Sequence, residues 1–518
     1  MGKTPAYYYI ALACIACAGI PKGYDEGGFS ASTKLPSFVQ DFNLVKANWE
    51  GRASELADRK ANISSFGVLG AAFGSLIAIF LNDRIGRLRT YQLAICVWGA
   101  GILMQIFSSG IYGFMLFARI FGGLGAGSLT VTAPLFLAEI ATAKRRGLMV
   151  SLYMVVLLTF LTLGFFINYG AEKHMASNRT QYRLVQGIPL IPTGIAFICS
   201  WWMSDTPRWL ASQDRYDEAL ASLARLRGSD MNDNTVREEF EQIEAQRRQK
   251  LADLSGTSLW NVLKEIVTVP TYRSRFLLVM TMQTIAQWSG GNGITYIPEI
   301  FQYAGIDGES SSLISSGAYG IVKLVFTMVF AWGLIDIIGR RRCFLAGLFL
   351  QLAAHIYMAV YMSYQPGVAS NKSASDAAIA SVFIYAVGWS IGLCTVQYLY
   401  GTEVFPTRIR SVSYASSMAL HWFFQFAVVR VTPNMFVSLD VWGAYIFWAL
   451  ICGCGIVILG LWAPETKGVP MERMGELFSG HWWMGWRAKL GSESLEELVR
   501  EGKVSEENVT TDTRVERV

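Results

Sequence analysis

Two charged patterns occur twice in this sequence of 518 residues, once in each half. Each copy begins with an acidic residue followed by two residues and Gly-Arg, and ends with a glutamate and an arginine seven positions beyond it. The members are Asp83, Arg87, Glu139 and Arg146 in the first copy, and Asp336, Arg340, Glu403 and Arg410 in the second. Long apolar stretches separate them. This repeat predicts two similar bundles of membrane helices related by pseudo-twofold symmetry.

The composition argues against an ordinary soluble protein. Charged residues make up 16% of the chain and apolar residues 52%, whereas soluble domains carry about 25% charged residues. A spanning helix needs about 20 mostly apolar residues. Twelve stretches qualify, near 6–22, 62–82, 91–109, 112–137, 147–169, 184–203, 274–303, 311–335, 342–364, 378–401, 411–438 and 441–462. We therefore expect an all-α membrane protein with twelve transmembrane helices in two six-helix halves.

A polar segment joins the two halves. Spaced Leu, Ile, Ala and Val among charged residues predict amphipathic surface helices near 215–227, 236–251 and 259–267. A solvated linker without docked helices is the alternative. The expected domains are an N-terminal half (1–204), a cytoplasmic helical linker (205–272), a C-terminal half (273–464) and a cytoplasmic tail (465–518).

Basic residues cluster after even-numbered spans. These clusters include Arg84, Arg87 and Arg89, and Arg340, Arg341 and Arg342. The positive-inside rule then places these loops and both termini in the cytoplasm of a multi-pass protein of the cell membrane. Each cluster is short and lies between spans, which argues against nucleic-acid binding. Sequons at Asn178 and Asn371 fall in predicted outer loops and indicate a glycoprotein.

The sequence shows no arrangement of residues that is typical of a catalytic site. All eight cysteines fall in predicted spans, and the four histidines are widely separated. No metal-ligand spacing and no nucleophile–base arrangement occurs, so we expect no enzyme activity, no metal and no cofactor. The glycine-rich run 122–127 continues an apolar span, which favours close helix packing over a phosphate-binding loop.

Charged residues inside the predicted spans are functional candidates, because they are costly in a bilayer unless paired. Asp25 and Arg119 have opposite charge and could face each other, either as a protonation switch or as a static ion pair. Glu26 is a third such residue. Lys323 either pairs with a carboxylate or helix end, or attracts an anionic substrate. Glu299 and Arg430 lie near outer helix ends, where we expect their side chains to reach water.

The seventh span combines polar side chains with helix-breaking residues. Gln283 and Gln287 share one helix face, and Asn292 lies in a glycine-rich stretch before Pro298. The pattern predicts a discontinuous helix. Amides beside aromatic rings such as Tyr296 and Trp422 suit a polyhydroxylated solute, since amides exchange hydrogen bonds with hydroxyls and rings cover apolar sugar faces.

In order, these motifs resemble the sugar porter family of the major facilitator superfamily, and its fungal members most closely. The resemblance covers about residues 6 to 478. It includes Gly23-Tyr24-Asp25, Arg119-Ile120-Phe121-Gly122-Gly123, Asp205-Thr206-Pro207-Arg208, Gln287-x-Ser289-Gly290, Glu403-x-Phe405-Pro406-Thr407-Arg408 and Pro464-Glu465-Thr466-Lys467-Gly468, together with the duplicated Gly-Arg motifs.

The resemblance implies a major facilitator fold with alternating access. It implies that Asp25 is a protonation site working with Arg119, and that the repeated acid–arginine sets form gating salt bridges. Gln287, Asn292 and Trp422 match family sugar contacts. The chain departs from the family at Met154, Ala286, Tyr398 and His421, and with the retained Lys323 this suggests a substrate other than glucose. An acid sugar, a cyclitol or quinate, a disaccharide and a pentose are the candidates.

The sequence therefore predicts a monomeric plasma-membrane transporter of a sugar or sugar-like polyol, driven by proton symport. Its partners would be the solute, the proton and the lipid bilayer. The predicted substrate-binding residues are Gln283, Gln287, Asn292, Tyr296, Tyr398, Trp422 and Met154. The alternatives are a proton-independent facilitator and a non-transporting nutrient sensor.

Overall fold

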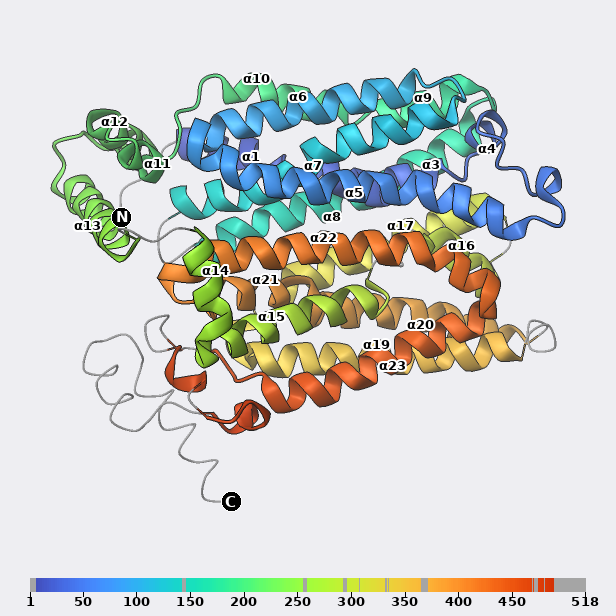
Figure 1. Ribbon diagram of the computed structural model, residues 1–518. Coiled ribbons are helices and arrows are strands. Elements are labelled where there is room, and N and C mark those ends of the chain that lie inside the picture. The colour runs from blue at the N-terminus through green and yellow to red at the C-terminus, as the bar shows by residue number, and fades with distance from the viewer. Residues whose placement is uncertain are drawn as a thin grey trace.

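The computed structural model describes residues 6–141, 146–254, 259–291, 296–306, 308–330, 333, 335–364, 371–467, 469, 474–478 and 480–488. All regular structure in these residues is helical. Most helices run along one common axis, and those of the first half lie beside those of the second (Figure 1). The described residues thus form the expected all-α bundle of two halves, with twelve spans.

The first half contains six spans, the first of which is segmented. That span runs through α1 (Ala6–Ala16), α2 (Gly19–Tyr24), a π-helical turn η1 (Asp25–Phe29) and α3 (Ser30–Ser32). Short α4 (Pro36–Asp41) and the 3-10 turn η2 (Lys46–Trp49) follow. The other spans are α5 (Ala53–Ile85), α6 (Arg87–Ile106), α7 (Tyr112–Ile140), α8 (Arg146–His174), and α9 (Arg179–Gly187) with α10 (Leu190–Ser200).

Four helices connect the halves, including the three expected amphipathic ones. They are α11 (Pro207–Ser212), α12 (Tyr216–Arg227), α13 (Asn234–Leu254) and α14 (Leu259–Thr268). Together α11, α12 and α13 lie at one end of the bundle (Figure 1). We call this the basic end, because the Arg84, Arg87 and Arg340 loops lie there as well.

The second half again contains six spans, and its seventh and tenth spans are broken. Its helices are α15 (Pro270–Trp288) with α16 (Ile297–Tyr303), α17 (Glu309–Val329), α18 (Ile335–Ile338), α19 (Arg340–Ser363), α20 (Lys372–Ile391) with α21 (Leu393–Glu403), α22 (Thr407–Ser438) and α23 (Asp440–Trp462). Two 3-10 turns, η6 (Glu476–Phe478) and η7 (Trp482–Arg487), follow. The predicted break in the seventh span is confirmed, since α15 ends before Gly290, whose φ is +87°.

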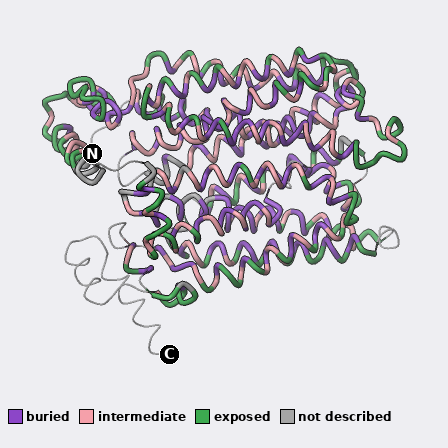
Figure 2. The backbone as a smooth tube through the Cα atoms, viewed as in Figure 1, coloured by how far each residue is buried: buried purple, intermediate pink, exposed green. Residues whose placement is uncertain are grey.

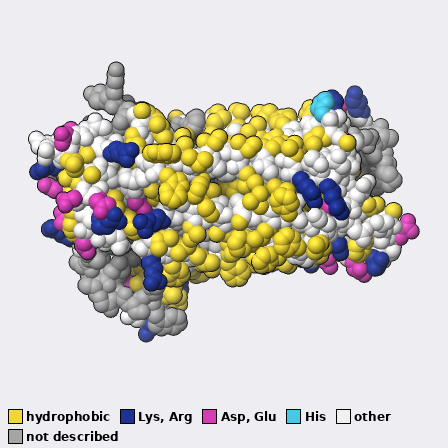
Figure 3. All heavy atoms as spheres, turned by 90° about the horizontal axis from the view of Figure 1, so that it is seen from above, with side chains coloured by type: hydrophobic (Ala, Val, Ile, Leu, Met, Phe, Trp, Pro, Cys, Tyr) yellow, Lys and Arg dark blue, Asp and Glu magenta, His cyan; other side chains and the backbone are white. Residues whose placement is uncertain are grey.

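The outer surface of the bundle is that of a membrane protein. Among the described residues, eight helices are long and apolar enough to cross a bilayer. Buried positions concentrate on the inward sides of the helices (Figure 2). Hydrophobic side chains cover the middle of the surface, and Lys, Arg, Asp and Glu gather towards both ends (Figure 3). The chain is therefore a multi-pass membrane protein.

Small residues determine how closely the spans approach one another. A Cβ added at Gly74 would lie 2.0 Å from the carbonyl oxygen of Leu124, and one at Gly127 would lie 2.0 Å from that of Ala71. The glycines therefore hold α5 against α7, which confirms their predicted packing role. Between the halves, α5 packs on α22 and α8 packs on α17.

Candidate functional site

Asp25 and Arg119, the predicted proton-coupling residues, form an ion pair inside the first half. One guanidinium nitrogen contacts Asp25 Oδ1, and Arg119 Nη2 donates to Asp25 Oδ2 at 3.1 Å. Arg119 also donates to the carbonyl oxygens of Ile63 at 3.0 Å and Ser64 at 3.2 Å. Its guanidinium carbon lies 3.9 Å from the centre of the Phe29 ring. These partners compensate the charge and satisfy N–H groups of a buried cation.

Local backbone features place this ion pair. Asp25 begins the π-helical turn η1, and such turns inside helices often mark functional sites. The turn packs closely on α8, because a Cβ at Gly27 would lie 2.0 Å from the Leu161 carbonyl oxygen. On the other side, Gly67 of α5 leaves room for the arginine, since a Cβ there would lie 2.4 Å from Arg119 Nη2.

A second pair of opposite charges lies on the same span, with Lys22 about one turn before Asp25 and Glu26 directly after it. Lys22 Nζ is 3.9 Å from Glu26 Oε1 and 4.5 Å from the centre of the Trp422 ring. Gln425 Nε2 donates to Glu26 Oε1 at 3.4 Å. Trp422 and Gln425 belong to α22, so this pair joins the two halves. The sequence analysis named Glu26 but missed Lys22, although their four-residue spacing was a usable signal.

A narrow cavity of about 40 Å³ lies between these groups. Its lining includes Asp25 and Arg119, Lys22 and Glu26, and Gln425. This volume holds about one water molecule, so the site is closed to a solute in this conformation. A much larger hollow of about 810 Å³ lies between α19 and α23, but its lining is almost wholly apolar and lies far from these charges.

In the second half, the structure brings two predicted substrate residues together with a histidine. Gln287 Nε2 lies 2.7 Å from His421 Nδ1, and the same ring nitrogen lies 3.0 Å from Gln283 Oε1. All three side chains are buried. The sequence analysis noted His421 only as a departure from the family. We call Gln283, Gln287 and His421 the polar centre; Trp422 follows His421 directly in the chain.

The other predicted substrate residues are more dispersed. The Tyr296 hydroxyl donates to the Val429 carbonyl oxygen at 2.8 Å, which ties α16 to α22. Met154 packs, half-buried, against the hydrophobic core. Tyr398 lies on α21, but its side chain lies outside the described residues, as does the whole of Asn292.

Several buried polar atoms lack a hydrogen-bond partner within the described ranges, among them three on α8, α15 and α22, the helices that pack on the first span or carry the polar centre. These three are the Tyr153 hydroxyl on α8, Gln283 Nε2 on α15 and Gln425 Oε1 on α22. Buried polar atoms without partners are rare and call for an explanation. Of the three, Gln425 lines the central cavity, where a polar ligand would reach it. The sequence analysis missed Tyr153, which precedes the noted Met154.

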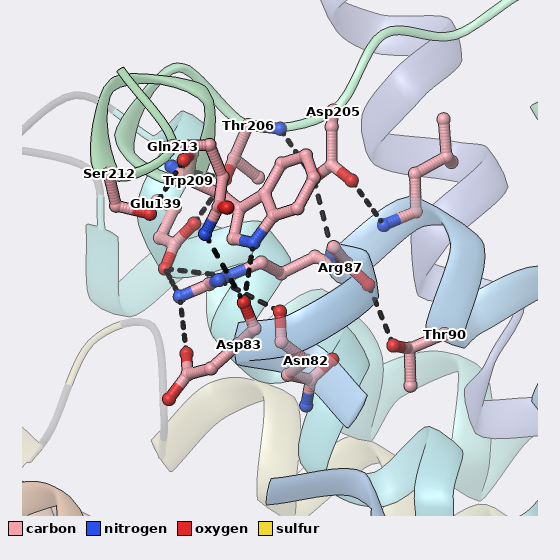
Figure 4. A network of polar contacts seen from close by, with 12 residues as sticks. Asn82, Asp83, Arg87, Thr90, Glu139, Asp205, Thr206, Trp209, Ser212 and Gln213 are labelled. Atoms are coloured by element: carbon pink, nitrogen blue, oxygen red, sulfur yellow. Dashed lines mark hydrogen bonds and ion pairs between the residues drawn. The ribbon is translucent and has the colours of Figure 1, made fainter. Parts of the chain in front are cut away.

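At the basic end, the first predicted gating set forms a network (Figure 4). Arg87 Nη2 lies 3.4 Å from Asp83 Oδ1 and 3.1 Å from Glu139 Oε1. The Thr206 hydroxyl donates to Glu139, and Trp209 Nε1 donates to the Asp83 carbonyl oxygen at 3.0 Å. The network therefore ties α5, α6 and α7 to the start of the linker. The side chains of Arg146, Asp336, Glu403 and Arg410 lie outside the described residues, so the rest of the gating prediction stays a prediction.

Each half contains a carboxylate that caps the start of a spanning helix, and the sequence analysis did not anticipate either cap. Asp205 accepts from the backbone nitrogens of Arg87 at 3.2 Å and Leu88 at 3.1 Å, at the start of α6. Glu465 accepts from those of Arg340 at 2.9 Å and Arg341 at 3.1 Å, at the start of α19. Burial raises the pKa of the Asp205 carboxyl, although its N–H donors oppose that shift.

Glycine is required where each carboxylate cap meets its helix. Gly86 and Gly339 have φ of +99° and +101°, in the region that disfavours other residues. A Cβ at Gly86 would lie 2.2 Å from Asp205 Oδ2, and one at Gly339 would lie 2.5 Å from Glu465 Oε2. The Gly-Arg repeat in the sequence thus has a physical cause: the glycine admits the cap and the following residue donates to it.

At the opposite end, two ion pairs join the halves. Lys34 contacts Glu299, and Arg430 Nη1 lies 2.7 Å from Asp58 Oδ1. Asn434 Nδ2 donates to the same Asp58 oxygen at 2.8 Å. We expected the side chains of Glu299 and Arg430 to reach water, and both are partly exposed. They also bind partners from the first half, because the two halves meet at this end.

Comparisons with known proteins agree with this architecture. A family model described as "Sugar (and other) transporter" matches residues 11–478. The quinate permease of Neurospora africana is 29% identical over 488 residues, covering 91% of this chain and 88% of the relative. The probable quinate permease of Aspergillus niger is 29% identical over 524 residues, covering 98% and 95%.

Solved structures of similar shape support the fold. The proton:xylose symporter XylE bound to 6-bromo-6-deoxy-D-glucose has a TM-score of 0.75 at 19% identity, covering 92% of this chain and 100% of that one. The inward-open xylose transporter XylE from E. coli has a TM-score of 0.71 at 18% identity, covering 90% and 99%. With the family match across nearly all described spans, the chain belongs to the sugar porter family of the major facilitator superfamily, a family of transporters and not of enzymes.

Proposed function

We propose that this protein carries a sugar-like polyol together with a proton across the plasma membrane, by alternating access. The observation that carries the proposal is the ion pair between the buried Arg119 and the partly exposed Asp25, beside a closed central cavity. Protonation of Asp25 would remove the negative charge that compensates Arg119. An uncompensated buried cation is costly, so the proton would favour a rearrangement of the first span against α5 and α7.

The polar centre supports a polyol as the substrate. Gln283, Gln287 and His421 offer hydrogen-bonding groups, and Trp422 offers a ring face. The unsatisfied atoms of Tyr153 and Gln425 add further partners from both halves. Quinate, named for the fungal relatives, is a polyol of this kind. We include Asn292, Tyr296, Tyr398 and Met154 in the proposed substrate site on the basis of the family pattern.

The charged groups at the two ends of the bundle support an orientation of the protein in the membrane. We propose that the basic end faces the cytoplasm with both termini, following the positive-inside rule. The Lys34–Glu299 and Asp58–Arg430 pairs would then close the outer side. The halves 1–204 and 273–464 would rock about the closed site, with 205–272 as a helical tether and 465–518 as the tail.

The proposal is tested by proton uptake in vesicles that contain the purified protein. The panel holds hexoses, pentoses, disaccharides, uronates, quinate and neutral polyols. We expect protons to enter with one class of solute, and only in the presence of protein. Solute entry without proton movement would make the protein a facilitator. A panel in which no labelled solute crosses would contradict transport and favour a sensor.

A further inference from the structure

We infer that Lys323 makes the central site selective for a polyol bearing one carboxylate, so that the transported solute is a monoanion. This inference rests on the proposed function and names its substrate class. It is carried by the position of Lys323 between the halves, by the lack of a carboxylate partner for it among the described residues and by the charge balance of the bundle centre.

Lys323 is a buried cation to which the described residues offer no counterion. It lies on α17 and is 4% exposed. Its Nζ lies 5.5 Å from the centre of the Trp389 ring. Within the described part of the chain, no carboxylate lies within 4.0 Å of that nitrogen and no hydrogen bond reaches it. A ring face offsets only part of the cost of burying an ammonium group.

The face of α17 that carries Lys323 lies against the first half. A Cβ at Gly320, one turn earlier, would lie 2.6 Å from Thr162 Oγ1 of α8. The charged groups whose fields reach Lys323 are Glu26 and Lys22 of the first span. Lys323 does not line the closed cavity itself, but it lies where the second half meets the first, within the electrostatic reach of the Lys22–Glu26 pair.

The charges of the described bundle centre do not cancel. Asp25 and Arg119 neutralise each other, and Lys22 and Glu26 do the same. Lys323 remains, which leaves one positive charge among these five described groups. A neutral sugar would leave that charge uncompensated. A carboxylate would neutralise it, and the hydroxyl groups of the same molecule would bind the unsatisfied atoms of Gln283, Gln425 and Tyr153.

The charges of the substrate and the proton together determine the net charge that crosses the membrane in each transport cycle. One carboxylate carries a charge of −1 and one proton on Asp25 carries +1, so the two together carry none. A neutral polyol moved with one proton would instead carry +1. Coupled transport of the proposed substrate should therefore be insensitive to membrane potential, whereas coupled transport of a neutral sugar should respond to it.

The first test uses the unaltered protein in vesicles with matched solute pairs. The pairs are quinate with quinamide, and glucuronate with glucuronamide, in which a neutral amide replaces the carboxylate. We expect at least a tenfold preference for the carboxylate of one pair, and equal uptake with and without an imposed potential. Equal affinity within both pairs, or transport of neutral sugars alone, would overturn the inference while leaving the proposed function intact. No transport of any solute would overturn both.

The second test assigns the preference to Lys323. In Lys323→Gln, the affinity for the carboxylate should fall about ten- to a hundredfold, the range expected for losing a charged hydrogen bond. Inhibition by the amide should not change. Lys323→Arg should keep most of the preference, and Lys173→Gln, at the exposed outer end of α8, should behave as the unaltered protein. Equal losses for carboxylate and amide in Lys323→Gln would make Lys323 structural; if that variant does not fold, the first test still decides.

Discussion

The two halves of this bundle treat a buried cation in opposite ways. Arg119 in the first half has two carboxylate contacts, two carbonyl oxygens and a ring face. Lys323 in the second half is equally buried, at 4% exposure, but has only the Trp389 ring among the described residues. An internal counterion suits a switch that a proton can open. A cation without an internal counterion suits a site in which a bound anionic substrate supplies the counterion.

The largest expected effect breaks this difference by making Arg119 resemble Lys323. In Asp25→Asn, Arg119 loses its counterion, and no proton can be bound at that carboxyl. We expect accumulation of solute against a gradient to disappear while exchange of preloaded solute continues. Proton-driven uptake and counterflow in the same vesicles measure the two. Asp217→Asn on exposed α12 is the control, and a mutant that still concentrates solute would refute the coupling role of Asp25.

A steric change tests the same pair without removing a charge. In Gly67→Ala, the new Cβ would lie 2.4 Å from Arg119 Nη2, so the guanidinium must move. We expect a destabilisation of about 1–3 kcal/mol, as for other overpacked sites, and reduced coupled uptake. Gly113→Ala is the matched control, since nothing lies within 4 Å of a Cβ there. Equal melting temperatures for the two variants would argue against a tightly built pair.

The caps at the basic end allow a comparison in which the halves should agree. Asp205→Ala and Glu465→Ala each remove acceptors from a helix start and should cost about 1 kcal/mol. Asn and Gln at these positions keep an acceptor. Because Asn keeps an acceptor for the two backbone N–H groups, Asp205→Asn should cost less than Asp205→Ala. Thermal unfolding in detergent measures this; equal losses for Ala and Asn would contradict the cap.

The smallest expected effect concerns the outer ion pairs. Asp58 is 45% exposed at its side chain, and such pairs contribute about 1 kcal/mol or less. Asp58→Asn should therefore shift the molecule towards an outward-open state by about two- to fivefold. The labelling rate of Val429→Cys, in the cavity wall, reports the shift from outside. Asp376→Asn at an exposed outer position is the control, and an unchanged rate would show that this pair does not gate.

The sequence was sufficient for those features that depend on local pattern. The length of the apolar stretches predicted the spans, and the spacing of apolar residues predicted α12, α13 and α14. The glycines predicted the helix break after Trp288. Opposite charges on two spans gave the Asp25–Arg119 pair, because few ionisable residues compete inside a bilayer.

Contacts between distant segments were harder to predict. Asp205 and Glu465 were recognised as motif members, but no local rule links them to helix starts more than 100 residues away. The partners of Glu299 and Arg430 were not predicted, because the sequence does not show where the halves meet. Lys22 was missed because a lysine and a glutamate four residues apart near a helix end more often lie on a solvent-exposed face.

The position of the caps also bears on how the chain is assembled during synthesis. The start of α6 receives its acceptor from Asp205, which follows the sixth span, and the start of α19 receives its own from Glu465, which follows the twelfth. The third and ninth spans thus keep open amino ends until the last helix of their half has emerged. Each of these two helix starts gains its carboxylate acceptor only when its half is complete, so an interrupted half lacks the side-chain cap of one spanning helix.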